Sequence, residues 1–349
     1  MNTEIVIIEE ENIDREAITR AGKIIKAGGL VAFPTETVYG IGGDALNASS
    51  SEKIYAAKGR PSDNPLIVHI TRIDALSFLV KEIPETAYKL ADKFWPGPLT
   101  MIFHKSDHVP KRTTGGLETV AVRMPSNKVA GALIEAAGGY IAAPSANRSG
   151  RPSPTVAKYV IEDLEGRVDM IIDGGESVIG LESTIVDLTE EKPVILRPGY
   201  ITKEMIAAVI GNVDVDRAIT DEACSAAPKA PGMKYRHYAP EGSLMIVEGA
   251  AQQVEAYINE RLKSGRAEGK RTGVIATDET AGHYHADSIK SVGSRSDKEQ
   301  IARHLFRILR EFDDENIQVI YTESFEQQGV GAAIMNRLLK AAGHRVVSL

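Results

Sequence analysis

The chain has 349 residues, of which 43% are hydrophobic and 26% charged, and its formal net charge is −7 at pH 7. This length favours two domains over one, and the composition excludes an intrinsically disordered chain. The acidic balance argues against a general nucleic-acid coat but leaves room for a local basic pocket. The single cysteine, Cys224, excludes intrachain disulfides and every metal motif built on cysteine pairs.

The N-terminal part predicts alternating helices and strands. The first residues of the sequence include several acids and no long apolar stretch. This pattern argues against a signal peptide or a membrane anchor, so we expect a cytoplasmic protein with no membrane contact. Residues 14–29 predict a helix that Asp14 caps and Gly28 and Gly29 end, and "LVAF" predicts a buried strand that breaks at Pro34. Similar short apolar runs continue to about residue 212, which indicates an α/β or α+β domain with a mixed sheet.

A weakly patterned segment separates this domain from a second one. Residues 213–242 carry no clear helical or strand period, whereas strands and amphipathic helices alternate over residues 243–349. Such alternation is typical of a parallel, Rossmann-like sheet. We therefore expect an α/β domain over 1–212, a linker over 213–242 and a smaller α/β domain over 243–349.

Several common motifs are absent from the sequence. It contains no P-loop, no complete dinucleotide-binding glycine pattern, no HExxH and no GxSxG, so zinc proteolysis and a nucleophile elbow have no support. His283, His285 and Asp287 alternate as they would on one face of a strand, but a solvated loop is favoured over a metal site because no further ligand is in view.

Two stretches carry groups suited to binding. In "FPTETVYGIGGDA", the hydroxyls of Thr35 and Thr37 and the carboxylate of Glu36 follow a strand and precede flexible glycines, as at a pocket rim, although a polar loop would look the same. Thr35 and Thr37 would lie on the same side of an extended segment. In "KGRP", Lys58 and Arg60 form either a phosphate clamp or a solvated charge pair.

Later stretches add a cation and neutral polar groups. Arg123 interrupts an alternating strand, "TVAVRMP", and a half-buried cation needs an anionic partner, which is either a structural acid or a substrate carboxylate. "APSANRSGRPSPT" supplies hydroxyl and amide groups between prolines, and "ESTIVD" and "LRPG" add Ser183 and Arg197. Each of these stretches alone is weak evidence for a site.

Together, and in this order, the motifs resemble one family. "PTETVYG", "KGRP", "NPLIVHI", "FWPGPLT", "VRMP", "PSAN", "ESTIVD", "LRPG" and "PGMKYRHYAP" are similar to those of the threonylcarbamoyl-AMP synthases, in the two-domain form with an N-terminal YrdC-like domain. The resemblance covers residues 15 to 240, and beyond them it rests on length and the α/β pattern. It implies an open, twisted, mixed sheet followed by a Rossmann-like domain.

The resemblance also implies a reaction. Such enzymes form threonylcarbamoyl-AMP and pyrophosphate from L-threonine, bicarbonate or CO2, and ATP with Mg²⁺. The product feeds the t6A modification at position 37 of tRNA, so a downstream threonylcarbamoyl-transfer machinery is an expected partner and direct tRNA contact is possible. Because a carbamate oxygen attacks the α-phosphate of ATP, no protein nucleophile is required, which agrees with the missing motifs.

The same resemblance assigns site residues one by one. The residues expected at threonine are Thr37, His69, Arg123, Ser183 and the backbone around Ala143, with Arg123 on the carboxylate. Those expected at ATP are Lys58, Arg60, Asn64, Thr119, Ser145, Ser153 and Arg197, with Lys58 and Arg60 on the phosphates as catalytic groups. No metal ligand is assigned, since Mg²⁺ is expected to arrive on the ATP phosphates.

The spacer "PGMKYRHYAP" is richer in aromatic and basic residues than a tether requires. In two-domain relatives this segment folds over the cavity, which makes Tyr235 and His237 candidates for nucleotide contacts. We therefore expect a lid that excludes water from the labile adenylate.

Three other functions compete with this one. A YrdC-like fold with a basic cavity also suits an RNA-binding module, which the acidic net charge disfavours. Dihydroxybutanone-phosphate synthase has a similar fold, but its acidic metal-site motifs are not evident. Hydrogenase-maturation proteins that carry a YrdC-like domain would need zinc-finger cysteines, which one cysteine excludes.

Overall fold

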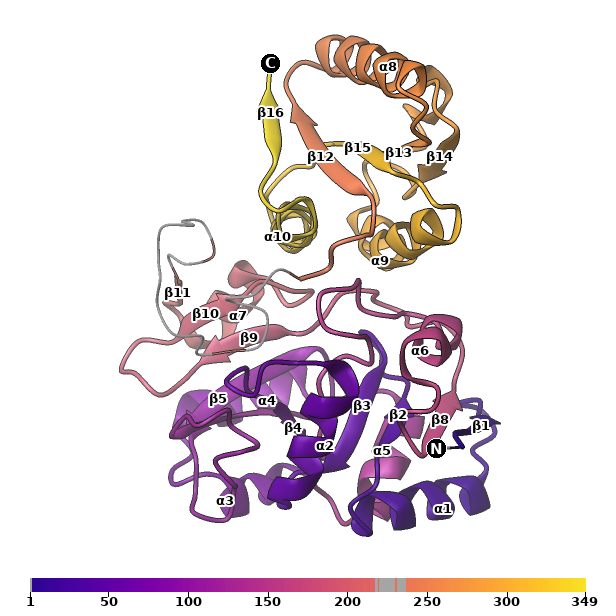
Figure 1. Cartoon of the computed structure of the whole chain (residues 1–349). Coiled ribbons are helices and arrows are strands. Elements are labelled where there is room, and N and C mark those ends of the chain that lie inside the picture. The colour runs from indigo at the N-terminus through magenta and orange to yellow at the C-terminus, as the bar shows by residue number, and fades with distance from the viewer. Residues whose placement is uncertain (1, 217–218, 220–229, 231–236) are drawn as a thin grey trace. The chain divides into compact units, whose positions relative to one another are not determined.

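The computed structural model describes every residue except 1, 217–218, 220–229 and 231–236. The chain forms two compact units (Figure 1). The first comprises residues 1–149, 154–178 and 182–234, and the second comprises 150–153, 179–181 and 235–349. The main division falls inside the segment 213–242 that we expect to be a linker, and two short loops of the N-terminal part group with the second unit.

The first unit is built on a mixed sheet, as the sequence predicts. Its spatial order is β1 (Glu4–Ile7), β8 (Met170–Asp173), β2 (Val31–Phe33), β3 (Gly40–Asp44), β7 (Ile141–Ala142), β4 (Ile67–His69), β6 (Thr119–Arg123), β5 (Leu99–His104), β9 (Thr184–Asp187), β10 (Val194–Arg197) and β11 (Asp214–Val215). The sheet contains both parallel pairs, such as β4 with β6, and antiparallel pairs, such as β5 with β6. Strands distant in sequence therefore become neighbours.

Helices cover both faces of this sheet. They are α1 (Arg15–Lys26), α2 (Ala48–Lys58), α3 (Leu76–Leu79), α4 (Glu85–Phe94), α5 (Lys128–Ala136), α6 (Ala157–Leu164) and α7 (Lys203–Ile210), with a 3-10 turn, η1, at Ile73–Ala75. The expected cap of α1 is confirmed, because the Asp14 carboxylate accepts hydrogen bonds from the amides of Glu16 and Ala17. The cap satisfies donors that the helix itself cannot.

Alternation along β2 separates two apolar cores. Val31 and Phe33 face a core that includes α1 and α5, whereas Ala32 faces the opposite core with α2, α4 and α6. Successive side chains of a strand point to opposite faces, so each strand residue commits to one layer. Burial on both faces holds the strands rigidly, and this fixes the positions of the polar residues at their ends.

The second unit contains a wholly parallel sheet, which confirms the Rossmann-like expectation. Its order is β14 (Ser288–Ser291), β13 (Thr272–Ala276), β15 (Val319–Glu323), β12 (Ser243–Glu248) and β16 (Val346–Ser348). The helices α8 (Ala251–Ala267), α9 (Lys298–Asp314) and α10 (Val330–Ala342), and the 3-10 turn η3 (Ala281–His283), connect these strands. Figure 1 shows α8 on one face of the sheet and α9 and α10 on the other.

The stretch with His283, His285 and Asp287, for which the sequence favoured a solvated loop over a metal site, belongs to this second unit. His283 is exposed and its Nδ1 lies 3.0 Å from Glu255 Oε2, while the Asp287 carboxylate accepts hydrogen bonds from Thr272. No group of three His, Cys, Asp or Glu side chains within the described ranges is placed to hold a metal ion. Among the same residues, every helix is too short or too polar to cross a bilayer.

Candidate active site

The ends of four strands bring the central polar residues together. Because β4 and β6 are parallel and in register, His69 and Arg123 end their strands side by side. Strand β5 runs antiparallel to β6 and pairs Thr100 with Arg123, and β9 runs parallel to β5 and begins just after Ser183. The carboxyl ends of β4 and β6 therefore meet the amino ends of β5 and β9 at one edge of the sheet.

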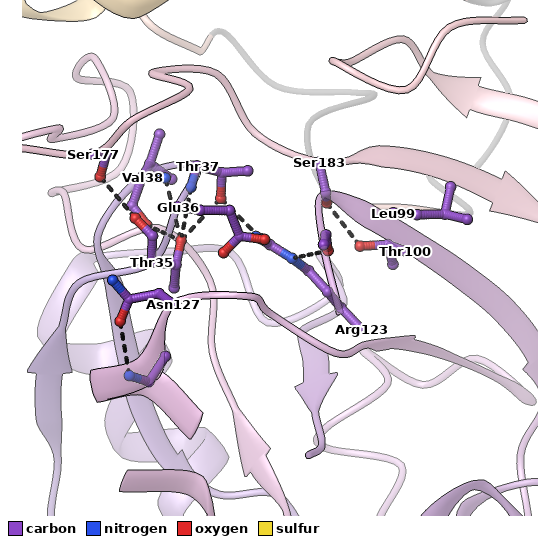
Figure 2. A network of polar contacts seen from close by, with 12 residues as sticks. Thr35, Glu36, Thr37, Val38, Leu99, Thr100, Arg123, Asn127, Ser177 and Ser183 are labelled. Carbon is purple, nitrogen blue, oxygen red and sulfur yellow. Dashed lines mark hydrogen bonds and ion pairs between the residues drawn. The ribbon is translucent and has the colours of Figure 1, made fainter. Parts of the chain in front are cut away.

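Arg123 is the centre of this cluster (Figure 2). Its guanidinium is buried; Nη1 donates a hydrogen bond to Thr37 Oγ1 at 2.9 Å, and Nε donates to the carbonyl of Gly97 at 3.4 Å. Nη2 lies 2.7 Å from Oε1 of Glu36, with both side chains less than a tenth exposed. The structure thus supplies one of the two partners expected from the sequence, a structural acid.

The contact between Glu36 and Arg123 is an ion pair without hydrogen-bond alignment. Neither carboxylate oxygen of Glu36, nor Nη2 of Arg123, has a hydrogen-bond partner among the described residues. A buried carboxylate with no donor has lost its hydration and gained only a Coulombic contact. The two carboxylate oxygens of Glu36 and Nη2 of Arg123 can therefore form further hydrogen bonds in the middle of the site.

Thr35 and Thr37 have different roles in the loop after β2. Their hydroxyl oxygens lie 2.9 Å apart because the chain bends at residues 36–38 and is not extended there as the sequence suggested. Thr35 Oγ1 donates to the carbonyl of Val38 at 2.6 Å, and the Thr35 carbonyl accepts from Ser177 Oγ at 3.0 Å. The hydroxyl of Thr35 thus shapes the loop, whereas that of Thr37 reaches Arg123 (Figure 2).

His69 is a neutral side chain in this environment. Burial lowers the pKa of His69 to about 3, and the positive charge of Arg123 is the second cause of this shift. The ring Nδ1 lies 3.1 Å from the carbonyl oxygen of Ile67. Phe33 packs against the ring edge to face at a centroid distance of 6.5 Å. His69 therefore offers a neutral imidazole and does not compete with Arg123 for an anion.

The buried neutral state of His69 has a measurable effect on stability. The pKa in the folded state lies below the value of about 6.5 in an unfolded chain, so this contribution is complete above pH 6.5 and is lost as pH falls towards 3. We expect wild-type protein to lose about 2 kcal/mol more unfolding free energy than His69→Gln between pH 7 and pH 5. Denaturant titrations at both pH values measure this; the exposed His285→Gln should behave as wild type, and equal losses in wild type and His69→Gln would refute the assignment.

Ser183 and Arg197 form a second contact at the same edge. Arg197 donates from Nε to the Ser183 carbonyl at 3.0 Å and from Nη2 to Ser183 Oγ at 3.1 Å. Ser183 Oγ also lies 2.7 Å from Thr100 Oγ1. The residue expected at threonine and a residue expected at ATP are therefore bonded to each other.

Lys58 and Arg60 make bonds to backbone carbonyls in the loops beside α2. Lys58 Nζ donates to the carbonyls of Ser145 and Asn147, and Ser145 Oγ donates to Asn147 Oδ1 at 2.6 Å. Arg60 Nη2 donates to Asn64 Oδ1 at 2.6 Å and to the Pro65 carbonyl at 2.9 Å. The structure groups Lys58 with Ser145 and Arg60 with Asn64; both cations are buried and so are not a solvated pair.

The remaining expected site residues lie apart from this cluster or outside it. Thr119 begins β6, four residues before Arg123 and so ~13 Å from it along the strand. Ala143 is buried just after β7, and its amide donates to the carbonyl of Ile67 at 2.9 Å. Ser153 is buried and His237 is half-buried, and both belong to the second unit. Tyr235 lies outside the described residues.

Sequence reasoning did not assign a role to two residues of the cluster. Glu36 stands in the quoted run "PTETVYG", but its pairing with Arg123 spans 87 positions and has no local signal. Thr100 ends "FWPGPLT", and only the register of β5 against β6 and β9 brings it to Arg123 and Ser183. The half-buried cation at position 123 was the one available sign that an acid would lie nearby.

The cluster defines a class of binding site. A buried guanidinium, a neutral imidazole and several hydroxyls can orient a small molecule that carries a carboxylate and further polar groups. These described residues offer no cysteine thiolate, and their hydroxyls bond to Arg123, Arg197 and one another, so the arrangement suits positioning and charge neutralisation more than covalent catalysis. The fold and the site thus define an α/β protein whose strand ends carry polar groups suited to a small carboxylate ligand.

Comparisons with known proteins give the family. A family model described as "Telomere recombination" matches residues 23–199, and one described as "Threonylcarbamoyl-AMP synthase, C-terminal domain" matches residues 201–343. The chain is 49% identical to the threonylcarbamoyl-AMP synthase of Pyrococcus abyssi, covering 99% of each chain, and 49% identical to that of Bacillus subtilis, covering 98% of this chain and 97% of the relative. It belongs to the threonylcarbamoyl-AMP synthase family, in its two-domain form.

A solved structure agrees over the full length. The crystal structure of the P. abyssi protein Sua5 complexed with L-threonine matches with a TM-score of 0.94 and 48% identity, covering 99% of this chain and 100% of that chain. The resemblance inferred from the motifs and the expected fold class, a YrdC-like domain followed by a Rossmann-like domain, are confirmed.

Proposed function

We propose that this chain is an L-threonylcarbamoyladenylate synthase, which forms threonylcarbamoyl-AMP and pyrophosphate from L-threonine, bicarbonate or CO2, and ATP. The observation that carries the proposal is full-length similarity to threonylcarbamoyl-AMP synthases together with a buried guanidinium among hydroxyls at the strand ends. A relative of the same two-domain form was solved in complex with L-threonine. RNA binding, the rival expected from the fold, has no comparable support.

The cluster around Arg123 suits threonine. Arg123 would pair with its carboxylate, which a guanidinium binds well because the two groups are planar and oppositely charged. Thr37 and Ser183 supply hydroxyls for the polar groups of threonine, and the neutral ring of His69 adds a donor or acceptor without adding charge. The backbone around Ala143 completes the set implied by the resemblance.

The reaction then needs positioning and charge neutralisation. The carbamate oxygen of N-carboxythreonine attacks the α-phosphate of ATP in line and pyrophosphate leaves, so no covalent enzyme intermediate forms. In the first unit, the residues proposed to hold ATP are Lys58, Arg60, Asn64, Thr119, Ser145 and Arg197. Mg²⁺ would be held by the phosphates of ATP and would neutralise their charge, and the roles of Ser153, Tyr235 and His237 stay predictions from the resemblance.

The test is direct. Purified protein is incubated with ATP, Mg²⁺ and bicarbonate, with and without L-threonine, while pyrophosphate release is measured and the adenylate is identified by mass spectrometry. We expect release only when threonine and bicarbonate are both present. RNA retained at moderate salt without any release of pyrophosphate would contradict the proposal and favour the RNA-binding alternative.

The fate of the product follows from its chemistry. A mixed anhydride of a carbamate and AMP is an activated acyl donor, so an enzyme that transfers the threonylcarbamoyl group to tRNA for t6A37 is the proposed partner. Direct contact of this chain with tRNA, and its location in the cytoplasm, also stay predictions from the sequence.

A further inference from the structure

The reaction contains a proton transfer that no residue assigned so far performs. At neutral pH the amine of free threonine is an ammonium, which has no lone pair and cannot attack CO2. Forming the carbamate from threonine ammonium and CO2 releases two protons. The first must leave nitrogen before the C–N bond forms, so a base beside the amine would speed the step.

Glu36 has the properties of such a base. It is buried, it lies 2.7 Å from Arg123 Nη2, and neither of its oxygens accepts a hydrogen bond from a described residue. The two groups of an α-amino acid, carboxylate and amine, are attached to one carbon atom. A ligand whose carboxylate pairs with Arg123 therefore brings its amine within a few ångströms of the Glu36 carboxylate.

We infer that Glu36 accepts the proton from the ammonium of bound threonine. This inference rests on the proposed function and deepens it. The N–H bond breaks and its proton passes to a Glu36 oxygen, and the freed lone pair forms a bond to the carbon of CO2 as one C–O π bond opens. The second N–H proton passes to bicarbonate or water, which leaves the carbamate anion, and Glu36 returns its proton to solvent when the product leaves.

The electrostatics of the cluster agree with this role. Before threonine arrives, one guanidinium faces one carboxylate, and the pair is neutral. The carboxylate of threonine adds a second negative charge beside the same guanidinium, and two carboxylates that share one cation favour a proton on one of them. The source of that proton is the ammonium in the same ligand. Among the described residues Arg123 is the charged group in contact with Glu36, and His69, on the strand next to that of Arg123, stays neutral.

Glu36→Gln tests the inference because glutamine keeps the size of the side chain and cannot take the proton. We expect calorimetry to show threonine binding within about threefold of wild type, since Arg123 is retained. The rate of pyrophosphate release at saturating threonine, ATP and bicarbonate should fall about 100-fold at pH 7, the effect typical of losing a general base. Glu36→Asp, which keeps a carboxylate, should recover part of the rate.

The pH profile separates a base from a structural acid. In Glu36→Gln the reactive amine must come deprotonated from solution, so the rate should rise about tenfold per pH unit until threonine itself is deprotonated, and the defect should shrink accordingly. Wild type and the matched surface variant Glu118→Gln should show a flatter profile. An unchanged rate, or a loss that is the same at every pH and is matched by weaker threonine binding, would overturn the inference. If wild type itself releases no pyrophosphate, the proposed function fails instead.

Discussion

Replacing Arg123 by methionine should lower kcat/KM for threonine by about 10³-fold. The guanidinium is buried and contacts Thr37, Gly97 and Glu36, so methionine fills its volume without any of these contacts. Removing one partner of a buried charge pair formed with a bound molecule costs about 2–5 kcal/mol, and 1.4 kcal/mol corresponds to a factor of ten. Steady-state pyrophosphate release as a function of threonine concentration measures the effect.

The same substitution should also destabilise the protein, because it leaves the Glu36 carboxylate buried without its cation. We expect a loss of about 3–5 kcal/mol in unfolding free energy, and most of it should return in the double variant Arg123→Met with Glu36→Gln. We expect that double variant to fold but not to bind threonine, which would separate the loss of function from the loss of structure. Arg20→Met, which breaks the exposed pair with Glu4, serves as the control and should cost no more than about 1 kcal/mol. Threonine use close to wild type in the double variant would show that Arg123 does not bind the substrate carboxylate.

Replacing Lys58 by methionine should lower kcat/KM for ATP by about 10²- to 10³-fold, the usual effect of removing one group that stabilises developing phosphate charge. Lys58 ends α2, and its buried ammonium donates to the carbonyls of Ser145 and Asn147. The substitution removes a positive charge and also loosens the loop that carries Ser145. Threonine binding, which depends on the cluster around Arg123, should stay within about threefold of wild type when measured by calorimetry.

Lys53→Met is the matched control for this prediction. Lys53 lies on the same helix and also donates from Nζ to a backbone carbonyl, that of Gly28, at 2.6 Å. Removal of a lysine that only ties a carbonyl should leave the kinetics of ATP use nearly unchanged. If Lys58→Met and Lys53→Met reduce kcat/KM for ATP equally, or if Lys58→Met weakens threonine binding as much as ATP use, Lys58 has a structural role and not a phosphate-binding one.

Local sequence signals predicted the elements that depend on local physics. The cap at Asp14 and the break of a strand before Pro34 follow from which backbone groups a single residue can satisfy or block, and both are found. The alternation of strands and helices after residue 243 likewise predicted the parallel sheet of the second unit. The ordered run of motifs was sufficient for the family, because it combined many weak signals along most of the first domain.

The partners of the site residues were beyond such signals. The strand pattern predicted that Arg123 needs an anion, and the resemblance favoured a substrate carboxylate, but neither pointed to Glu36, which the structure supplies. Lys58 and Arg60 could be recognised as constrained cations, but not as donors to the carbonyls of Asn147 and Pro65. The bond from Lys58 joins segments that the chain order does not bring together, and the bond from Arg60 depends on how its loop folds back on itself.

Periodicity, turn chemistry and motif order were sufficient to predict the two α/β units, the family and the residue types available for binding. Which of these residues come into contact depends on the tertiary fold. The order of strands in the first sheet places β4, β6, β5 and β9 next to one another although their chain order differs, and their register sets His69, Arg123, Thr100 and Ser183 at one edge. Strand order is fixed by burying both faces of the sheet under helices, which is a property of the whole domain and not of any one segment.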